Sequence, residues 1–182
     1  MFGGVYSGTR VFVTGDTGFK GSWLCLWLQH LGAEVCGYAL ESETEPAHHT
    51  LLSLSYTTEI GDIRNADQLH RAIADFQPEV VFHLAAQPLV RRSYAAPLET
   101  IHTNVLGTAN LFEACRQVNS VRAIVNITSD KCYENREWVW GYRENDPMGG
   151  FDPYSASKGC AELVTASWRN AFFPLHRYGD TH

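Results

Sequence analysis

Two short stretches of the chain combine residue types that can move protons. The segment TSDKCYEN places a hydroxyl, a carboxylate and an ammonium at consecutive positions, Ser129, Asp130 and Lys131. The segment YSASK places Tyr154 and Lys158 four residues apart, a spacing that brings two side chains onto one face of a helix. An ammonium beside a tyrosine favours its phenolate form, which can accept a proton. Both stretches therefore predict proton-transfer chemistry, with a solvated loop and a solvated helix face as the alternatives.

A third stretch, TGDTGFKG, contains glycines at three-residue intervals. Glycine lets a backbone turn tightly and approach a pyrophosphate, and the start of a helix offers N–H donors and the positive end of its dipole. A strand pattern precedes the glycines and a helix pattern follows them, which favours nucleotide binding over an ordinary glycine-rich turn. The candidate cofactor-binding residues in this stretch are Gly15, Thr17, Gly18, Phe19, Lys20 and Gly21.

The elements that must position these stretches alternate along the chain. Apolar runs predict strands over 10–15, 34–40, 57–63, 78–86 and 121–129. Helical patterns cover 19–32, 65–76, 97–118 and 153–173. Strands that are apolar throughout and alternate with helices are typical of a parallel sheet covered on both faces. The predicted fold is an α/β, Rossmann-type doubly wound parallel sheet, in which ligands bind beyond the carboxyl ends of the strands.

Two more predicted strands end in candidate cofactor contacts. GDIR supplies Asp62 and Ile63, and the Asp62 carboxylate could accept a hydrogen bond from an adenine amino group or, equally, make a turn or helix cap. HLAAQ ends the following strand, and its small side chains leave room for a cofactor against the backbone, although small residues also simply pack. The candidates in this segment are Leu84, Ala85, Ala86 and Gln87.

The composition is that of an ordinary globular domain. The 182 residues are 45% hydrophobic and 19% charged, with a net charge of −6, which argues against a basic surface for nucleic acid. No apolar run is long enough to span a bilayer, and the first residues lack the layout of a signal peptide. Five cysteines without CxxC spacing predict core residues in a reducing cytoplasm, and neither a disulfide framework nor a metal site.

The motifs together resemble the extended short-chain dehydrogenase/reductases, and within them the CDP-glucose 4,6-dehydratases. The stretches that carry the resemblance are VTGDTGFKGSWL, GDIR, FHLAAQPLVRRSY, NVLGT, TSDKCYENREWVWGYRENDPMGG and YSASKGCAELV, which span nearly the whole chain. The glycine motif and YxxxK indicate only a dinucleotide enzyme, whereas the pair TSDKCYEN and WGYREND is more specific. Related dTDP-glucose dehydratases carry Asp-Glu where this chain has Asp130-Lys131.

The resemblance implies a redox-neutral lyase reaction with NAD as the cofactor. Tyr154 would take the proton of the sugar 4-hydroxyl as hydride leaves C4, and Ser129 with Lys158 would hold that hydroxyl. Asp130 would protonate the departing 6-hydroxyl, and Lys131 would remove or help to remove the C5 proton before hydride returns to C6. Which of Asp130 and Lys131 is the acid and which the base is left open.

The resemblance implies three further features. Asn104, in NVLGT, would help to organise the active site, and an ordinary polar residue in a helix is the alternative. The substrate would be a small nucleotide sugar. The chain would form a homodimer or a larger homo-oligomer through the helices predicted over 97–118 and 153–173.

The sequence departs from the family pattern in two ways. No acid occupies Ala39, where an NAD-binding fold often places one, so that the choice between NAD and NADP stays open; Asp16 in the glycine loop would repel an extra phosphate. The chain stops at His182, whereas the family continues with a region that grips the nucleotide sugar. We therefore expect residues 1–182 to be an incomplete NAD(P)-binding domain with weak or no activity alone. Another extended-family epimerase or decarboxylase, or a non-catalytic NAD-binding fragment, is the alternative.

Overall fold

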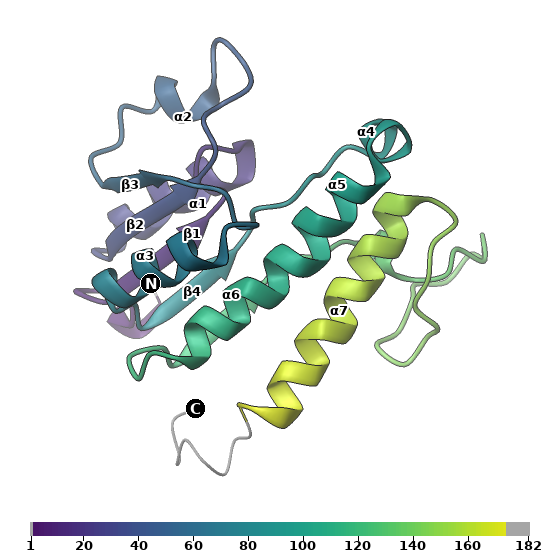
Figure 1. Ribbon diagram of the computed structural model, residues 1–182. Helices are drawn as coiled ribbons and strands as arrows, with labels where there is room; N and C mark the ends of the chain where they lie inside the picture. The colour runs from purple at the N-terminus through teal and green to yellow at the C-terminus, as the bar shows by residue number, and fades with distance from the viewer. Residues whose placement is uncertain (1, 174–182) are drawn as a thin grey trace. The chain divides into compact units, whose positions relative to one another are not determined.

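The structure is a computed structural model that describes residues 2–173 (Figure 1). By the contacts between its residues, the chain divides into two compact units. The first unit comprises residues 2–85 and 110–127, and the second comprises residues 86–109 and 128–173. None of the helices in residues 2–173 is long and apolar enough to cross a membrane.

The first unit contains a five-stranded parallel sheet. Its strands are β1 (Arg10–Thr14), β2 (Glu34–Ala39), β3 (Thr57–Ile60), β4 (Val80–His83) and β5 (Ala123–Asn126). Their order is β3-β2-β1-β4-β5, and every neighbouring pair is parallel. The direction of winding therefore reverses between β1 and β4, which is the point where ligands bind in doubly wound sheets. The predicted fold class is confirmed.

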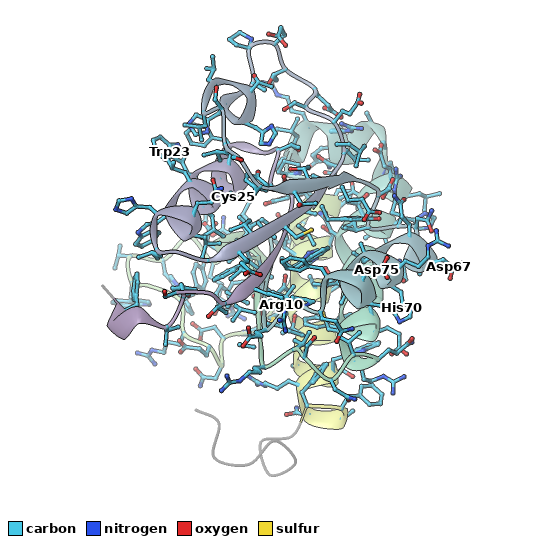
Figure 2. All side chains as sticks on the ribbon, turned by 90° about the vertical axis from the view of Figure 1, so that its left-hand side faces the viewer. Arg10, Trp23, Cys25, Asp67, His70 and Asp75 are labelled. Carbon is cyan, nitrogen blue, oxygen red and sulfur yellow. The ribbon has the colours of Figure 1, made fainter. Side chains whose placement is uncertain are left out.

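Two helices that the sequence predicts and one short helix that it does not predict follow strands of the first unit, and the two longer ones pack by their buried faces. They are α1 (Phe19–His30), α2 (His48–Leu51) and α3 (Ala66–Phe76), after a short 3-10 turn, η1 (Phe2–Gly4). On α1 the buried residues Cys25 and Leu28 join the apolar core of β1, while Trp23 is half exposed on the same helix (Figure 2). On α3 the side chain of Asn65 accepts a hydrogen bond from the backbone N–H of Gln68, which is the helix cap that the sequence predicts.

The second unit is built around one long helix, α7 (Pro153–Ala171). Shorter segments pack against it, and Figure 1 shows α5 running beside it. These segments are α4 (Val90–Ala95), α5 (Pro97–Ile101), the π-helical turn η2 (His102–Leu106) and the 3-10 turn η3 (Asp130–Cys132). Asp152 caps α7 by accepting the N–H of Ser155 at 2.9 Å, and Pro153 occupies the first helical position.

The helix predicted over 97–118 is interrupted. It consists of α5, the π-helical turn η2 and α6 (Gly107–Arg116), so that the regular α pattern breaks around Asn104. Three predicted strands also end earlier than their apolar patterns, at Ile60, His83 and Asn126. The first residue after each of these points still donates its backbone N–H to the neighbouring strand, Gly61 to Ala39, Leu84 to Thr14 and Ile127 to His83.

The cysteines are mostly core residues, as predicted. Cys25, Cys36, Cys115 and Cys132 are buried, and all five thiols are free. Cys160, on α7, is exposed, which the sequence did not indicate. Burial raises the pKa of the Cys115 thiol to about 12, so this residue stays a neutral packing group.

Candidate functional site

The glycine-rich loop between β1 and α1 is so compact at two of its glycines that a side chain would not fit there. Gly15 has a φ of +77°, and a Cβ built there would lie 2.8 Å from the backbone nitrogen of Ala85. A Cβ on Gly21 would lie 2.1 Å from the carbonyl oxygen of Gly15. Gly18, which precedes α1, provides no side-chain cap, so the first amides of α1 are left to another acceptor. This glycine cradle at a helix start fits a pyrophosphate group.

The other predicted cofactor-binding residues of this loop differ in how far they are exposed to solvent. Gly18, Phe19 and Lys20 are exposed, whereas Thr17 is half-buried. The Thr17 hydroxyl donates to the carbonyl of Leu40 at 2.9 Å, so it ties the loop to the chain that follows β2. Phe19 packs against His48 with 5.2 Å between the ring centroids.

Asp16 lies inside this loop but points into the protein. Its side chain is fully buried, and Oδ2 accepts hydrogen bonds from Tyr56 Oη at 3.0 Å and Thr58 Oγ1 at 3.2 Å. Oδ1 has no hydrogen-bond partner, and a Cβ on Gly37 would lie 2.1 Å from Oδ2. Burial raises the pKa of Asp16, and the two hydroxyl donors oppose that effect only in part. The carboxylate therefore sits under β2, away from the exposed side of the loop.

The hydroxyl of Thr14, at the end of β1, organises the end of β4. Thr14 Oγ1 accepts the backbone N–H groups of Leu84 and Ala85, each at 3.2 Å. It also lies 2.7 Å from His83 Nδ1. Because its oxygen already accepts two N–H groups, the single hydroxyl proton goes to Nδ1, which makes His83 the Nε2–H tautomer. The sequence did not single out Thr14, although a hydroxyl that ends an apolar strand is a usable signal.

Asp62 already has a strong partner within its own loop. Arg64 donates its backbone N–H to Oδ1 at 2.9 Å and its Nη2 to Oδ2 at 2.5 Å. These bonds from Arg64 hold the pKa of Asp62 below its usual value. The neighbouring Ile63 is buried. The backbone bond makes Asp62 a turn residue, one of the two roles that the sequence left open, and an adenine amino group would have to share the carboxylate with Arg64.

In the second unit, Asn104 is buried and all its polar groups are used. Its Oδ1 accepts the backbone N–H of Gln87 at 2.8 Å, and its Nδ2 donates to the carbonyl of Gln87 at 3.1 Å and to Ser157 Oγ at 2.8 Å. Ser157 in turn donates to the carbonyl of Tyr154 at 2.7 Å. The Gln87 side chain donates to Thr100 Oγ1 at 2.9 Å. Asn104 thus joins the Gln87 segment to α7, and Ser157 is a contributor that sequence reasoning missed.

Tyr154 and Lys158 lie on α7, where the sequence placed them. Both are buried, with relative exposures of 8% and 6%. Their four-residue spacing puts them on one face of this helix. A solvated helix face would expose both side chains. Their burial therefore argues against the solvated helix face that the sequence left open as the alternative.

The Ser129–Lys131 segment forms the short turn η3. Ser129 caps it, because its Oγ accepts the backbone N–H of Lys131 at 3.2 Å, and the same hydroxyl donates to Asp130 Oδ1 at 3.1 Å. Asp130 and Lys131 are exposed and line one cavity of about 220 Å³. The cavity is also lined by Tyr133, Asn135, Tyr142, Gly150, Phe151, Asp152 and Ser155. The rings of Tyr133 and Tyr142 stack 5.2 Å apart at 4°.

The structure therefore brings the predicted residues together within each unit. The first unit holds the glycine loop, Asp62, Ile63, Leu84 and Ala85, and the second unit holds Ala86, Gln87, Asn104 and the proton-transfer residues. Among residues 2–173, no three His, Cys, Asp or Glu side chains gather in a way that could hold a metal ion.

A doubly wound parallel sheet, a glycine-rich loop after its first strand and a Tyr-x-x-x-Lys pair on a helix define the class of extended short-chain dehydrogenase/reductases. Residues 12–176 match the family described as GDP-mannose 4,6 dehydratase, and the chain belongs to this family. The family resemblance inferred from the sequence is confirmed.

Individual relatives agree with this assignment. The chain is 62% identical over 175 residues to the CDP-glucose 4,6-dehydratase of Salmonella typhimurium strain LT2, covering 95% of this chain and 49% of that protein. It is 34% identical to the UDP-glucose 4-epimerase of Mycolicibacterium smegmatis, covering 90% of this chain and 52% of that protein. The chain thus spans about half the length of these relatives.

Solved structures show the same fold. The UDP-glucose 4-epimerase of Brucella ovis in complex with NAD superposes with a TM-score of 0.80 at 25% identity, covering 91% of this chain and 49% of that chain. The UDP-glucose 4-epimerase of Thermus thermophilus, also in complex with NAD, gives a TM-score of 0.77 at 28% identity, covering 91% and 52%.

Replacing Gly15 by alanine should destabilise the protein more than replacing Gly8. Both glycines have positive φ, +77° and +72°, so alanine at either should cost about 1 kcal/mol in backbone strain. Only the Gly15 Cβ meets backbone atoms, and the resulting overpacking should add about 1–3 kcal/mol. Urea unfolding of Gly15→Ala and Gly8→Ala measures the difference, and equal losses would show that the close approach to Ala85 is not a constraint.

Replacing Asp16 by asparagine should stabilise the protein at neutral pH. Burial raises the pKa of Asp16 in the native state above the usual value of 3.8 that applies in the unfolded chain. At a pH between these two pKa values, Asp16 is protonated in the native state and ionised in the unfolded chain. The contribution of Asp16 to stability therefore falls as pH rises through this window, and the gain from Asp16→Asn should shrink again as pH falls below the native pKa. Urea unfolding from pH 3.5 to 8 measures this, with Asp75→Asn, exposed on α3 (Figure 2), as the control. A pH-independent effect of Asp16→Asn would contradict the assignment.

Proposed function

We propose that the protein is an NAD-dependent lyase, a nucleotide-sugar 4,6-dehydratase that converts CDP-glucose to CDP-4-keto-6-deoxyglucose. The observation that carries the proposal is the Ser129-Asp130-Lys131 turn, whose carboxylate and ammonium line one cavity in the unit that also holds buried Tyr154 and Lys158. The 62% identity with a CDP-glucose 4,6-dehydratase supports this substrate class.

The residues of the first unit fit the cofactor. The glycine cradle would hold the pyrophosphate through the free amides at the start of α1, and Asp62 and Ile63 would border the adenine. Leu84 and Ala85, with Ala86 and Gln87 of the following segment, add further proposed cofactor contacts. Tyr154 and Lys158, besides their part in proton transfer, are the last two residues proposed to contact the cofactor. The NAD complexes of two structural relatives favour NAD over NADP. When bound, NAD supplies a hydride acceptor for C4 of the sugar and a hydride donor for C6.

The first proton transfer in this proposal uses α7 and the Ser129 hydroxyl. Tyr154 takes the proton of the sugar 4-hydroxyl, and the ammonium of Lys158, four residues further along the same helix, supports this step. Ser129 holds the 4-hydroxyl, for which it must turn its proton from Asp130 towards the substrate. Thr128 is a poor substitute because its hydroxyl proton is committed to Glu162. Asn104 supports the step indirectly, since it fixes Ser157 and so the first turns of α7.

The elimination uses the two side chains that line the cavity. The 4-ketone acidifies the C5 proton, a base removes it, and the 6-hydroxyl leaves as water with a proton from an acid. We propose that Lys131, as a neutral amine, takes the C5 proton and that Asp130, as a carboxylic acid, gives its proton to the leaving 6-hydroxyl, so the pair ends the step as ammonium and carboxylate. One carboxylate oxygen of Asp130 accepts from Ser129, which leaves the other to carry the proton. Lys131 is exposed on a short turn, so it can approach the substrate without unfolding any element.

Other parts of the proposal follow from the resemblance alone. These are a single NAD(P)-binding domain over residues 1–182, a homodimer through the helices over 97–118 and 153–173, and a cytoplasmic location.

An epimerase is the second candidate, because epimerases are among the structural relatives. An epimerase needs no acid and base for water loss, so the fate of the 6-hydroxyl separates the two activities.

Any turnover of CDP-glucose by the purified protein, in the presence of NAD and heavy water, should be a dehydration, although weak or no activity is expected of these 182 residues alone. The product should be one water lighter and should retain deuterium from the solvent, because the C5 proton is exchanged during elimination. Mass spectrometry of the sugar nucleotide measures both changes. A change of configuration without water loss would reject the dehydratase, whereas a sugar of unchanged mass would agree with the weak or no activity expected of these 182 residues alone.

Replacing Lys131 by methionine should stop water loss without stopping oxidation at C4. Loss of a general acid or base lowers a rate by about 10²–10⁴-fold. Absorbance at 340 nm should therefore show reduced cofactor accumulating in Lys131→Met but not in the unmodified enzyme. Arg143→Met, an exposed cation on the same loop that does not line the cavity, is the matched control. Normal water loss in Lys131→Met would remove this residue from the mechanism.

A further inference from the structure

The segment from Thr128 to Tyr133 contacts α7 at both of its ends, by a hydrogen bond at the first and by packing at the second. At its start, the Thr128 hydroxyl donates a hydrogen bond to Glu162 Oε1, a residue 34 positions further along the chain. At its other end, the carbonyl of Cys132 accepts the backbone N–H of Gly149 at 2.9 Å and packs onto α7 at Gly159, where a Cβ would come within 3.2 Å of it. The three consecutive proton-transfer residues lie between these two attachments.

Glu162 occupies a distinctive position on α7. It follows Lys158 by four residues and Tyr154 by eight, so it extends the same helix face by one turn. Its side chain is half-buried. Burial raises the pKa of the Cys132 thiol, and the negative charge of Glu162 adds to that effect, which places the carboxylate close to the η3 turn.

An ordinary exposed glutamate on a helix would not have these contacts. Such a side chain is solvated or pairs with a cation one turn away, as Glu113 does with Arg116 on α6. Glu162 instead accepts a hydrogen bond from a distant hydroxyl at the end of the β5 segment. A hydrogen bond to a carboxylate is about twice as strong as one between neutral groups, so it can hold the start of a loop in place.

We propose that Glu162 is a positioning residue: by accepting the Thr128 hydroxyl, it fixes the η3 segment against the helix face that carries Tyr154 and Lys158. This inference rests on the proposed dehydratase function. Glu162 does not touch the substrate. It acts through Thr128, whose position determines where the side chains of the following residues, Ser129–Lys131, are placed. A displacement of catalytic groups by about 1 Å can cost about 100-fold in rate, so one hydrogen bond at this place has a large effect.

The test is a double-mutant cycle with conservative partners. Glu162→Ala and Thr128→Val each remove the hydrogen bond, and each should lower kcat by about 10–100-fold with little change in KM. The double variant should be no worse than either single variant, because both changes break the same contact. Glu162→Gln and Thr128→Ser keep an acceptor and a donor, and they should stay within about threefold of the unmodified enzyme. Glu113→Ala, a helix glutamate of the first unit, is the control.

Hydrogen exchange provides a readout that does not depend on turnover. The amides of Ser129–Tyr133 should exchange faster in Glu162→Ala and Thr128→Val, and at the normal rate in the two conservative variants. Additive losses of kcat in the double variant, or unchanged exchange in both disruptive variants, would overturn the positioning role. Turnover of CDP-glucose without water loss would reject the proposed function and the catalytic consequence with it. Where turnover is too weak to measure, the exchange rates alone decide, and normal exchange in both disruptive variants rejects the positioning role.

Discussion

The close approach of two backbones at Gly15 is the constraint on which the first unit depends. With no Cβ at this position, the end of β1 can turn against Ala85 at the end of β4, and the Thr14 hydroxyl binds the two amides that lie there. The strands that meet at this place are the ones between which the winding of the sheet reverses. A side chain at Gly15 would therefore disturb the turn, the ends of two central strands and the first amides of α1 together.

In the second unit, the structure depends in a similar way on the buried side-chain amide of Asn104. Asn104 saturates both the N–H and the carbonyl of Gln87 and also binds Ser157, so three chain segments share one side chain. Because a buried polar group without partners is costly, this set of bonds tolerates little rearrangement. The helix that carries Tyr154 and Lys158 is held by it near its first turns, while Asp152 caps the same helix and lines the neighbouring cavity. Rigid support of this kind is what proton transfer between fixed groups requires.

Much of this arrangement could be predicted from the sequence, and the failures have common physical causes. Apolar runs and helical spacing identified all five strands and the long helices, because burial on one face is a local property of the sequence. The π-helical turn at Asn104 could not be predicted, since it depends on Gln87 and Ser157, which are distant in sequence. The burial of Asp16 could not be predicted either, because the sequence pattern predicts an exposed carboxylate in a glycine loop. Its buried partners, Tyr56 and Thr58, are distant in sequence.

The π-helical turn has a consequence for how related chains can differ in length. A π turn contains one residue more than an α turn, so α5 and α6 are out of phase by that residue. A one-residue deletion within 102–106 that restores a regular α turn would therefore keep the side chains of α5 and α6 on the same faces, because the wide turn and the extra residue disappear together. What such a deletion would change is the turn that carries Asn104, and with it the bonds from Asn104 to Gln87 and Ser157. Related chains could thus differ by one residue here and keep their helix faces, at the expense of this buried amide.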